Sequence, residues 1–418
     1  MTDQTLTHQV IYSVFVRCHT PEGTFRALEG DLDRIRALGT DILWLMPIHP
    51  IGEVGRKGTL GSPYAIRDYR GINPEYGTRE DFVHLVDAIH ERGMKCIIDV
   101  VYNHTSPDSV LAHEHPEFFL RDGQGNPTRR VADWWDIVDL DYSVPALWDY
   151  QIETLKQWAA IVDGFRCDVA SCVPVAFWER ARREVEQVRP GCIWLAESVH
   201  GAHVREMRRI GAACATDTDL CRVFDMTYDY DLWPCYKGLL QGQLSLRQYI
   251  DLLTYQELTY PTGYVKARCV ENHDTERLAA HLSNQNQLHN WLAFLYFRRG
   301  AAMLYGGTEY ASRHRVTLFD KDDNFADRPL DVSDLLRRCK AMKTTLPLTG
   351  AVWYECCGTA AIGHYDGPDG TALGVFDLSG CGADVPVDLP DGPYENRLGG
   401  VVNVRDGHLA ADSLPVVI

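Results

Sequence analysis

Eight short β-rich runs, separated by stretches of helical periodicity, occupy the first three hundred residues and constrain the fold of this chain most strongly. Several runs are continuously apolar, as is typical of parallel strands that are buried on both faces. Such alternation predicts a closed barrel or an open doubly wound sheet, and a count of eight favours the (β/α)8 TIM barrel. The predicted strands are Val10–Val16, Ile42–Met46, Cys96–Val101, Gly164–Cys167, Ile193–Ala196, Phe224–Met226, Lys266–Val270 and Ala302–Leu304.

One intervening stretch carries clear signals for both ends of a helix. Thr78 is a good cap residue, and the apolar positions that follow it recur at intervals of three and four. Gly93 closes this stretch just before the third predicted strand.

Two segments depart from the alternation and predict additional structure. Residues 104–145 form a polar excursion rich in Pro and Gly, and loops of this length are usually lids or small subdomains. Beyond residue 345, short β-rich runs are divided by Gly, Pro and Asp clusters, which predicts an antiparallel β-domain. We therefore expect a barrel from 1–103 and 146–344, a subdomain inserted after strand three over 104–145, and a C-terminal β-sandwich domain over 345–418.

Charge and composition exclude several classes of partner. The net charge of −17 disfavours nucleic acid and anionic lipid surfaces, but it permits a neutral substrate. No signal peptide, long apolar span, dinucleotide-binding glycine motif or zinc-type cysteine pair is visible. Thirteen scattered cysteines are typical of a reducing compartment, so we expect a cytoplasmic protein with no membrane contact. The sequence carries no signal for oligomeric state.

Polar residues follow four of the predicted strands, at the end of a barrel where active sites lie. Taken singly, an Asp after a strand more often caps a helix, and a lone His is more often a satisfied loop residue. These structural explanations are less convincing for several ionisable residues at one rim. Placing like charges close together costs free energy, and proteins keep such clusters mainly at sites of chemistry. The residues are Asp99, Asn103 and His104 after the third strand, Arg166 and Asp168 at the fourth, Glu197 after the fifth, and His273 and Asp274 after the seventh.

Paired carboxylates of this kind favour cleavage of a glycosidic bond. One carboxylic acid protonates the departing oxygen, and a second carboxylate attacks the sugar or activates water. Arg166 lies two residues before Asp168 and so shares its face of the strand, where its charge favours an ionised Asp168. Burial of Glu197 beside other carboxylates is expected to raise its pKa and keep it a proton donor.

These segments resemble the four signature regions of the α-amylase family of glycoside hydrolases, in the family's order. They are residues 99–104 (Asp-Val-Val-Tyr-Asn-His), 164–168 (Gly-Phe-Arg-Cys-Asp), 196–197 (Ala-Glu) and 271–274 (Glu-Asn-His-Asp). Three further stretches, 61–69, 73–77 and 136–142, also resemble the family. The resemblance extends from about residue 10 to about residue 310.

The resemblance implies a retaining hydrolase that cleaves α-1,4-glucosidic bonds of starch-derived malto-oligosaccharides by double displacement. It implies three catalytic residues: Asp168 as nucleophile, Glu197 as acid and then base, and Asp274 as the carboxylate that stabilises the transition state. It also implies a substrate-binding set: Tyr64 beneath the sugar ring, His104 and His273 on its hydroxyls, Arg166 orienting the nucleophile, and Asp99 supporting the site.

The resemblance implies a metal only weakly. Asn103 lies where many family members place a calcium ligand, but the rest of that site belongs to the subdomain after strand three, which is short here. We therefore expect no required cofactor and treat calcium, with Asn103 as a ligand, as an open alternative.

Other activities on the same scaffold stay open. The family's Lys-His pair after the nucleophile is missing, which disfavours long polymers, and Val169 in that stretch is associated in relatives with α-1,6 bonds or simply packs well. The alternatives are an α-1,6-acting oligosaccharide glucosidase, a 4-α-glucanotransferase and a non-catalytic sugar-binding barrel associated with a transporter.

Overall fold

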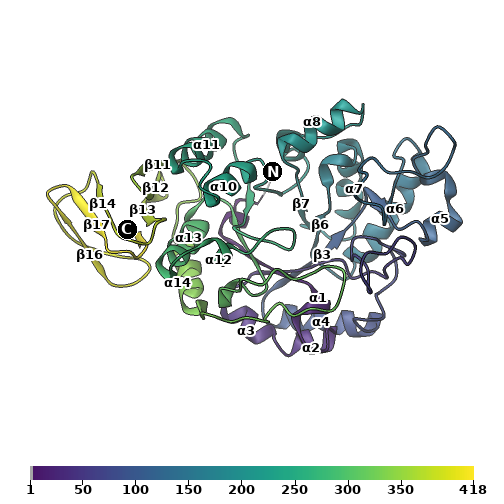
Figure 1. Ribbon diagram of the computed structural model, residues 1–418, viewed down its shortest axis with the longest axis horizontal. Helices are drawn as coiled ribbons and strands as arrows, with labels where there is room; N and C mark the ends of the chain where they lie inside the picture. The colour runs from purple at the N-terminus through teal and green to yellow at the C-terminus, as the bar shows by residue number, and fades with distance from the viewer. Residues whose placement is uncertain (1–2) are drawn as a thin grey trace.

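The computed structural model describes residues 3–418 and contains a closed barrel of eight parallel strands (Figure 1). The order around the barrel is β1-β10-β9-β8-β7-β6-β3-β2, and β1 pairs with both β2 and β10, which closes the ring. The predicted barrel is therefore confirmed. Its strands are β1 (Val10–Val14), β2 (Ile42–Leu45), β3 (Lys95–Val100), β6 (Gly164–Cys167), β7 (Ile193–Ala196), β8 (Met226–Tyr228), β9 (Lys266–Arg268) and β10 (Ala301–Tyr305).

The sixth barrel strand begins later than the sequence pattern predicts. The pattern indicated Phe224–Met226, whereas β8 spans Met226–Tyr228. Phe224 belongs to the preceding turn, because its N–H donates to the Leu220 carbonyl at 2.8 Å. Apolarity alone does not separate such a buried turn from the strand that follows it.

Helices cover the outside of the barrel. The helix predicted after Thr78 is α4, and Thr78 and Asp81 form a capping box at its start. Among the described residues no helix is both long and apolar enough to cross a bilayer. The helices are α1 (Val16–His19), α2 (Phe25–Glu29), α3 (Leu32–Ala37), α4 (Arg79–Glu91), α5 (Val110–Glu114), α6 (Pro145–Ala159), α7 (Val175–Val185), α8 (Gly201–Arg209), α9 (Asp217–Leu220), α10 (Trp233–Leu240), α11 (Leu246–Thr259), α12 (Leu278–His281), α13 (Gln285–Phe297) and α14 (Ser333–Lys343).

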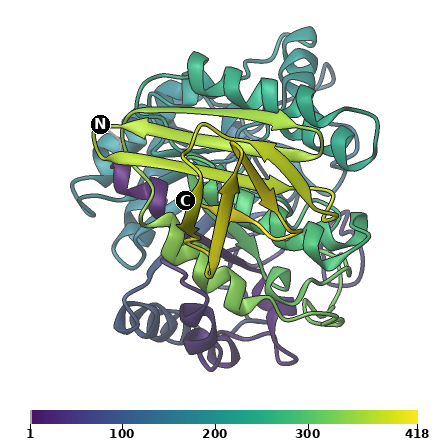
Figure 2. The ribbon, with the colours of Figure 1, turned by 90° about the vertical axis from the view of Figure 1, so that its left-hand side faces the viewer.

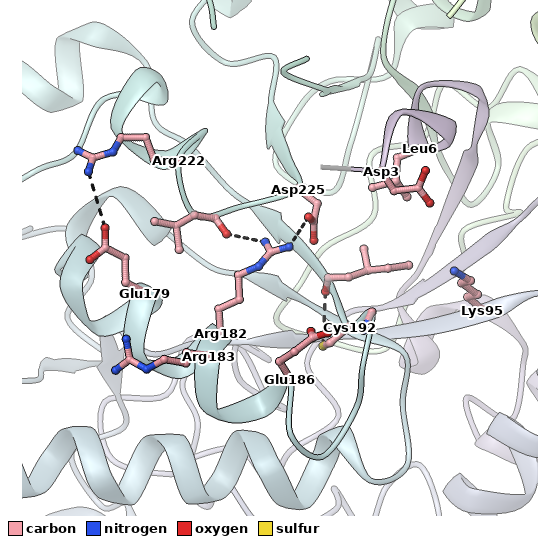
Figure 3. Close-up of a pocket in the computed structure, with 13 residues that line it drawn as sticks. Asp3, Leu6, Lys95, Glu179, Arg182, Arg183, Glu186, Cys192, Arg222 and Asp225 are labelled. Carbon is pink, nitrogen blue, oxygen red and sulfur yellow. Dashed lines mark hydrogen bonds and ion pairs between the residues drawn. The ribbon is translucent and has the colours of Figure 1, made fainter. Parts of the chain in front are cut away.

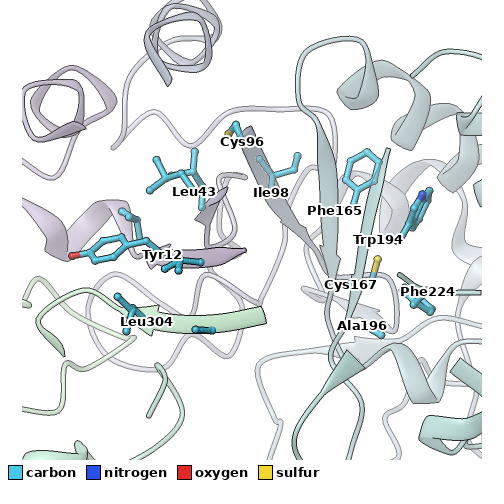
Figure 4. Close-up of a cluster of buried hydrophobic side chains, with 14 of the residues drawn as sticks. Tyr12, Leu43, Cys96, Ile98, Phe165, Cys167, Trp194, Ala196, Phe224 and Leu304 are labelled. Carbon is cyan, nitrogen blue, oxygen red and sulfur yellow. The ribbon is translucent and has the colours of Figure 1, made fainter. Parts of the chain in front are cut away.

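Alternating side chains on each strand divide the barrel into two apolar cores. The outward-facing residues pack under the helices, and Figure 4 shows Ile98, Phe165 and Trp194 in this layer. The inward-facing residues, such as Ile97 and Leu195, form a separate cluster inside the barrel. The same alternation turns the polar residues near the strand ends inward, toward the mouth of the barrel.

The insertion after β3 forms a small two-stranded sheet close to the barrel mouth. Strand β4 (His104–Thr105) pairs antiparallel with β5 (Val138–Asp139), and His104 lies opposite Asp139. The 3-10 turn η2 (Pro116–Phe118) and α5 lie between these strands. This pairing fixes the backbone of His104 at the rim.

The C-terminal region contains two four-stranded antiparallel sheets, seen toward the viewer in Figure 2. Val385, Leu409 and Val375 belong to a shared core of buried apolar side chains from both sheets. The sheets have the orders β11-β12-β13-β18 and β14-β17-β16-β15. Their strands are β11 (Ala351–Cys357), β12 (Ala360–Gly367), β13 (Gly370–Asp377), β14 (Ala383–Pro386), β15 (Gly392–Glu395), β16 (Val401–Arg405), β17 (His408–Ala411) and β18 (Val416–Val417).

Candidate active site

A fully buried arginine forms the floor of the candidate site. Arg166 lies on β6 with its side chain inside the barrel. Its Nη1 donates to both oxygens of Asp99, at 2.9 and 3.0 Å, and to Oδ1 of Asp168 at 2.8 Å. Asp99 comes from β3 and Asp168 directly follows β6. The guanidinium therefore holds two carboxylates from adjacent strands at the same nitrogen.

The second terminal nitrogen of the same guanidinium faces the carboxyl of Glu197. Nη2 of Arg166 lies 3.0 Å from Oε2 of Glu197 in an ion pair. The N–H of Val169 donates to the same oxygen at 2.8 Å. Asp168 and Glu197 thus contact opposite arms of one planar group.

Asp274 and its neighbours form one wall of the site. Nε2 of His273 lies 3.2 Å from Oδ2 of Asp274 and 2.8 Å from the Tyr64 hydroxyl. The Tyr64 hydroxyl donates to Oδ2 of Asp99 at 3.1 Å, and its ring stacks on His273 with centroids 5.4 Å apart. A continuous set of contacts therefore joins Asp99 on β3 to His273 and Asp274 after β9.

His104 completes the set of residues expected at the mouth. Its Nε2 lies 3.9 Å from Oδ2 of Asp168, and its ring tilts against Trp134 with centroids 5.5 Å apart. The structure thus brings together every catalytic and substrate-binding residue that the sequence indicated. The roles assigned to them belong to the proposal below.

Asn103 is buried but does not face a set of metal ligands. Its Nδ2 lies 3.1 Å from Nδ1 of His104. Asp139, which lies opposite the neighbouring His104, is paired with Arg130 at 3.1 Å. Within residues 3–418, no group of three or more His, Cys, Asp or Glu side chains is arranged to hold a metal ion. The side chains around Asn103 do not fit a calcium site, and the mechanism below uses no metal.

Six of the residues that the sequence indicated line a cavity of about 200 Å³ at the carboxyl ends of the barrel strands: Tyr64, His104, Asp168, Glu197, His273 and Asp274. That volume lies below the roughly 300–1,000 Å³ of pockets that take drug-sized ligands, so it suits a single sugar ring. The sequence did not indicate four of the lining residues, because they come from loops without a motif: Lys57, Trp134, Leu318 and Phe319. Three others lie within the stretches 61–69 and 136–142 that resemble the family: Ser62, Asp136 and Ile137.

The Lys57 ammonium group ties the inserted subdomain to the loop after β2. Its Nζ lies 2.9 Å from Oδ1 of Asp136 and 4.4 Å from the ring centroid of Trp135. The loop after β10 is fixed to the same region, because the Thr59 N–H donates to Asp320 at 2.7 Å. Three loops are thus linked around one side of the cavity.

Burial shifts the pKa values of the two central carboxyls upward. Burial raises the pKa of Asp168 to about 7, against the lowering effect of Arg166. Burial raises the pKa of Glu197 to about 8; Arg166 lowers it, while Asp168 and Asp274 add to the rise. Both carboxyls therefore keep a proton to higher pH than a free carboxyl does.

Burial also keeps the two histidines of the site neutral. It lowers the pKa of His273 to about 4, although Asp274 opposes the change. It lowers the pKa of His104 as well. A neutral imidazole both donates and accepts hydrogen bonds, which suits contact with sugar hydroxyls.

A larger cavity, of about 570 Å³, lies at the opposite end of the barrel near the starts of β3 and β7 (Figure 3). Its charged groups largely neutralise one another. Arg182 pairs with Asp225, and Arg222 lies 4.0 Å from Glu179. Among the described residues that line it, no pair of carboxylates shares one cation, so this cavity does not resemble a site for acid–base chemistry.

Comparison with known proteins gives the same answer as the geometry. Residues 9–328 match the model of the alpha amylase catalytic domain, and residues 358–418 match the model of the bacterial alpha amylase C-terminal domain. The chain belongs to the α-amylase family. Within this family, the cavity at the carboxyl ends of the strands is the candidate active site.

Solved structures of α-amylases share the whole architecture. An alpha-amylase from Lactobacillus plantarum is 45% identical, with 100% of this chain and 99% of that chain covered and a TM-score of 0.97. A noncanonic maltogenic alpha-amylase from Thermotoga neapolitana is 34% identical, with 99% and 98% covered and a TM-score of 0.86.

Curated relatives add a different named activity. An alpha-1,4-glucan:maltose-1-phosphate maltosyltransferase from Myxococcus xanthus is 32% identical over 262 residues. The match covers 56% of this chain and 37% of that protein, so this chain spans little more than a third of the relative.

Proposed function

We propose that this α-amylase family member is a retaining glycoside hydrolase that cleaves α-1,4-glucosidic bonds of malto-oligosaccharides. The single observation that carries the proposal is that Arg166 contacts both Asp168 and Glu197, within 3.0 Å, beneath a cavity that suits one sugar ring. Double displacement needs its two carboxyls only about 5 Å apart, and carboxyls on opposite arms of one guanidinium suit that spacing.

In the first half of the proposed reaction, Asp168 attacks the anomeric carbon and Glu197 protonates the departing oxygen. The covalent glycosyl-enzyme forms as the glycosidic bond breaks, and the leaving sugar departs with the proton of Glu197. The raised pKa of Glu197 supports its role as the acid, because the donor must hold its proton near neutral pH. The Nη1 group of Arg166, 2.8 Å from Oδ1 of Asp168, favours the ionised form that a nucleophile needs.

In the second half, Glu197 acts as a base. It takes a proton from water, the water oxygen attacks the anomeric carbon, and the bond to Asp168 breaks. Asp274, His104 and His273 line the cavity and are placed to bind ring hydroxyls. Their contacts with the distorted sugar are proposed to strengthen in the transition state.

A transferase on the same scaffold is the second candidate. The named activity of the curated relatives favours it, and it uses the same covalent intermediate with a sugar hydroxyl in place of water. An α-1,6-acting glucosidase is a further alternative, while a non-catalytic barrel has less support because all three carboxylates line the cavity.

The experiment is product chromatography with maltotriose, combined with NMR of the first anomer released. Hydrolysis predicts glucose and maltose as early products, with the α-anomer first. Early products longer than maltotriose would establish the transferase instead, and maltose 1-phosphate with glycogen as acceptor tests the relatives' named reaction. Isomaltose and panose test α-1,6 action. A protein that binds maltose but releases nothing from any donor would overturn the enzymatic proposal.

A further inference from the structure

The residue after the proposed nucleophile has an unusual backbone conformation. Val169 has φ 41° and ψ 42°, in the left-handed region. The other non-glycine residues with positive φ in the described chain are Ala311, Asp406 and Ser413, none of which is β-branched. For a β-branched residue this conformation is a true outlier, and such strain persists only where the surroundings impose it.

The conformation shifts the hydrogen bonding between β6 and β7 by one residue. Cys167 is paired with Ala196, and the Glu197 N–H donates to the Cys167 carbonyl at 3.0 Å. In a regular parallel ladder the next donor to the Glu197 carbonyl is the N–H of Val169. Here the N–H of Ala170 takes that place, at 3.0 Å.

The shift leaves the N–H of Val169 free to bond a side chain. It donates to Oε2 of Glu197 at 2.8 Å, so two consecutive amides hold the backbone and the carboxyl of one residue. Bulges with a left-handed residue occur next to active sites, where they redirect a group, and that position usually requires glycine. A valine at this position also places its side chain in the lining of the cavity.

We propose that the left-handed turn at Val169 is a positioning device that directs a backbone N–H onto the Glu197 carboxyl and holds it toward the sugar. This inference rests on the proposed function of Glu197 as acid and base. Val169 acts through Glu197 and takes no proton itself. A backbone N–H stays in place when side chains move, and the strained turn is what holds this donor in position.

The amide acts among other charged and titratable groups that face Glu197. A hydrogen bond to the ionised form favours that form, so this N–H opposes the effect of burial on the pKa of Glu197. Loss of the N–H is therefore expected to raise that pKa further. The groups that face Glu197 from neighbouring elements are Arg166 and Asp168 at β6, Asp99 on β3, Tyr228 on β8, Tyr230 beyond it, and Asp274 after β9.

The sharpest test removes only the donor. Replacing Val169 with its α-hydroxy acid analogue turns the amide into an ester and keeps the side chain. We expect the basic limb of kcat/KM to move up by about one pH unit, because a lost bond to a charged group has about that effect. We also expect kcat to fall about tenfold while KM changes far less, because the carboxyl loses its fixed orientation.

The chain offers a matched control. The same ester at Val173 removes an N–H that donates to the Ala170 carbonyl at 3.3 Å and leaves Glu197 untouched. The basic limb of the kcat/KM profile of this variant should stay where it is in the wild type. An unchanged limb in the Val169 ester, or an equal shift in the Val173 ester, would overturn the inference.

Side-chain variants keep the inference testable if the ester does not fold. Asparagine tolerates the left-handed region better than valine does, so Val169→Asn should raise the melting temperature. The basic limb of its kcat/KM profile should match that of the wild type. A limb displaced upward in this variant, with the fold intact, would contradict a role for the turn.

A spectroscopic readout separates this inference from the proposed function. The infrared carbonyl band of the protonated Glu197 carboxyl, assigned by its loss in Glu197→Gln, titrates without any turnover. A shifted titration in the Val169 ester supports the inference even where no glycosidic bond is cleaved. An unshifted band beside an inactive Glu197→Gln would leave the proposed function standing and remove only the role of Val169.

Discussion

The cavities at the two ends of the barrel differ in how their charges are balanced. At the carboxyl ends of the strands, Arg166 serves three carboxylates, and all of them are buried. At the amino ends, where the cavity is larger, Arg182 forms an ion pair with Asp225, and Arg222 forms one with Glu179. One-to-one pairing leaves no excess of charge, whereas an excess of buried carboxylates costs free energy and raises pKa values. The comparison therefore associates chemistry with the smaller cavity, where the buried carboxylates outnumber the cation that serves them.

The largest expected effect comes from removing one carboxylate charge at each end. Asp168→Asn should lower kcat on maltotriose by about 10⁴-fold or more, because an amide does not attack the anomeric carbon. Asp225→Asn, in the opposite cavity, should lower the melting temperature but change kcat by less than about twofold. Near-normal turnover by Asp168→Asn would show that the nucleophile is assigned wrongly.

Glu197→Gln sharpens the comparison, because the loss of activity in this variant should depend on the substrate. With maltotriose we expect kcat to fall by about 10² to 10⁴-fold, the usual contribution of a general acid and base. The leaving group of α-glucosyl fluoride needs no proton, so the rate of glycosyl-enzyme formation should recover with this substrate. A burst of released fluoride would show this recovery. An equal loss with both substrates would exclude Glu197 as the acid.

The pH dependence tests the raised pKa values at the carboxyl end. Activity should fall below about pH 7, because the pKa of Asp168 is about 7 and the nucleophile must be ionised. It should fall above about pH 8, because the pKa of Glu197 is about 8 and the acid must be protonated. The expected kcat/KM profile is therefore a bell, with limbs that approach tenfold per pH unit. A profile that is flat from pH 5 to 9, a range of about four units, would contradict these values.

The smallest expected effect concerns calcium. Because Arg130 pairs with Asp139, chelation with EDTA should leave kcat and the melting temperature unchanged. Arg130→Ala removes the guanidinium from the Asp139 carboxylate and provides a control in which calcium binding is easier. A large loss of wild-type activity that added calcium restores would show that Asn103 belongs to a metal site after all.

The sequence predicted the barrel because burial on both faces leaves a strong mark on it. Continuous apolar runs such as Ile193–Ala196 indicated parallel strands, and the cap at Thr78 indicated the start of α4. The sixth strand was misplaced by two residues, because Val223 and Phe224 just before it are also apolar and buried. Strand ends are set by hydrogen bonding, which apolarity does not record.

The candidate site was predictable only in part. Asp168 and Glu197 stand at strand ends, where the period of two and the polarity of a barrel determine the direction of the side chain. Lys57, Trp134 and Phe319 lie on loops, and nothing in their local sequence places them at the cavity. Loop residues meet through contacts between segments far apart in the chain, so local pattern carries no signal for them.

By itself, the sequence determined which residues are inward-facing and which strand ends carry carboxylates, because both follow from local periodicity. Only the tertiary structure decided that one guanidinium serves three of those carboxylates and that burial outweighs its charge in setting their pKa values. It also decided that Val169 turns left-handed and offers its amide to Glu197. These outcomes depend on desolvation and on distances between different strands, and both arise only when the barrel closes.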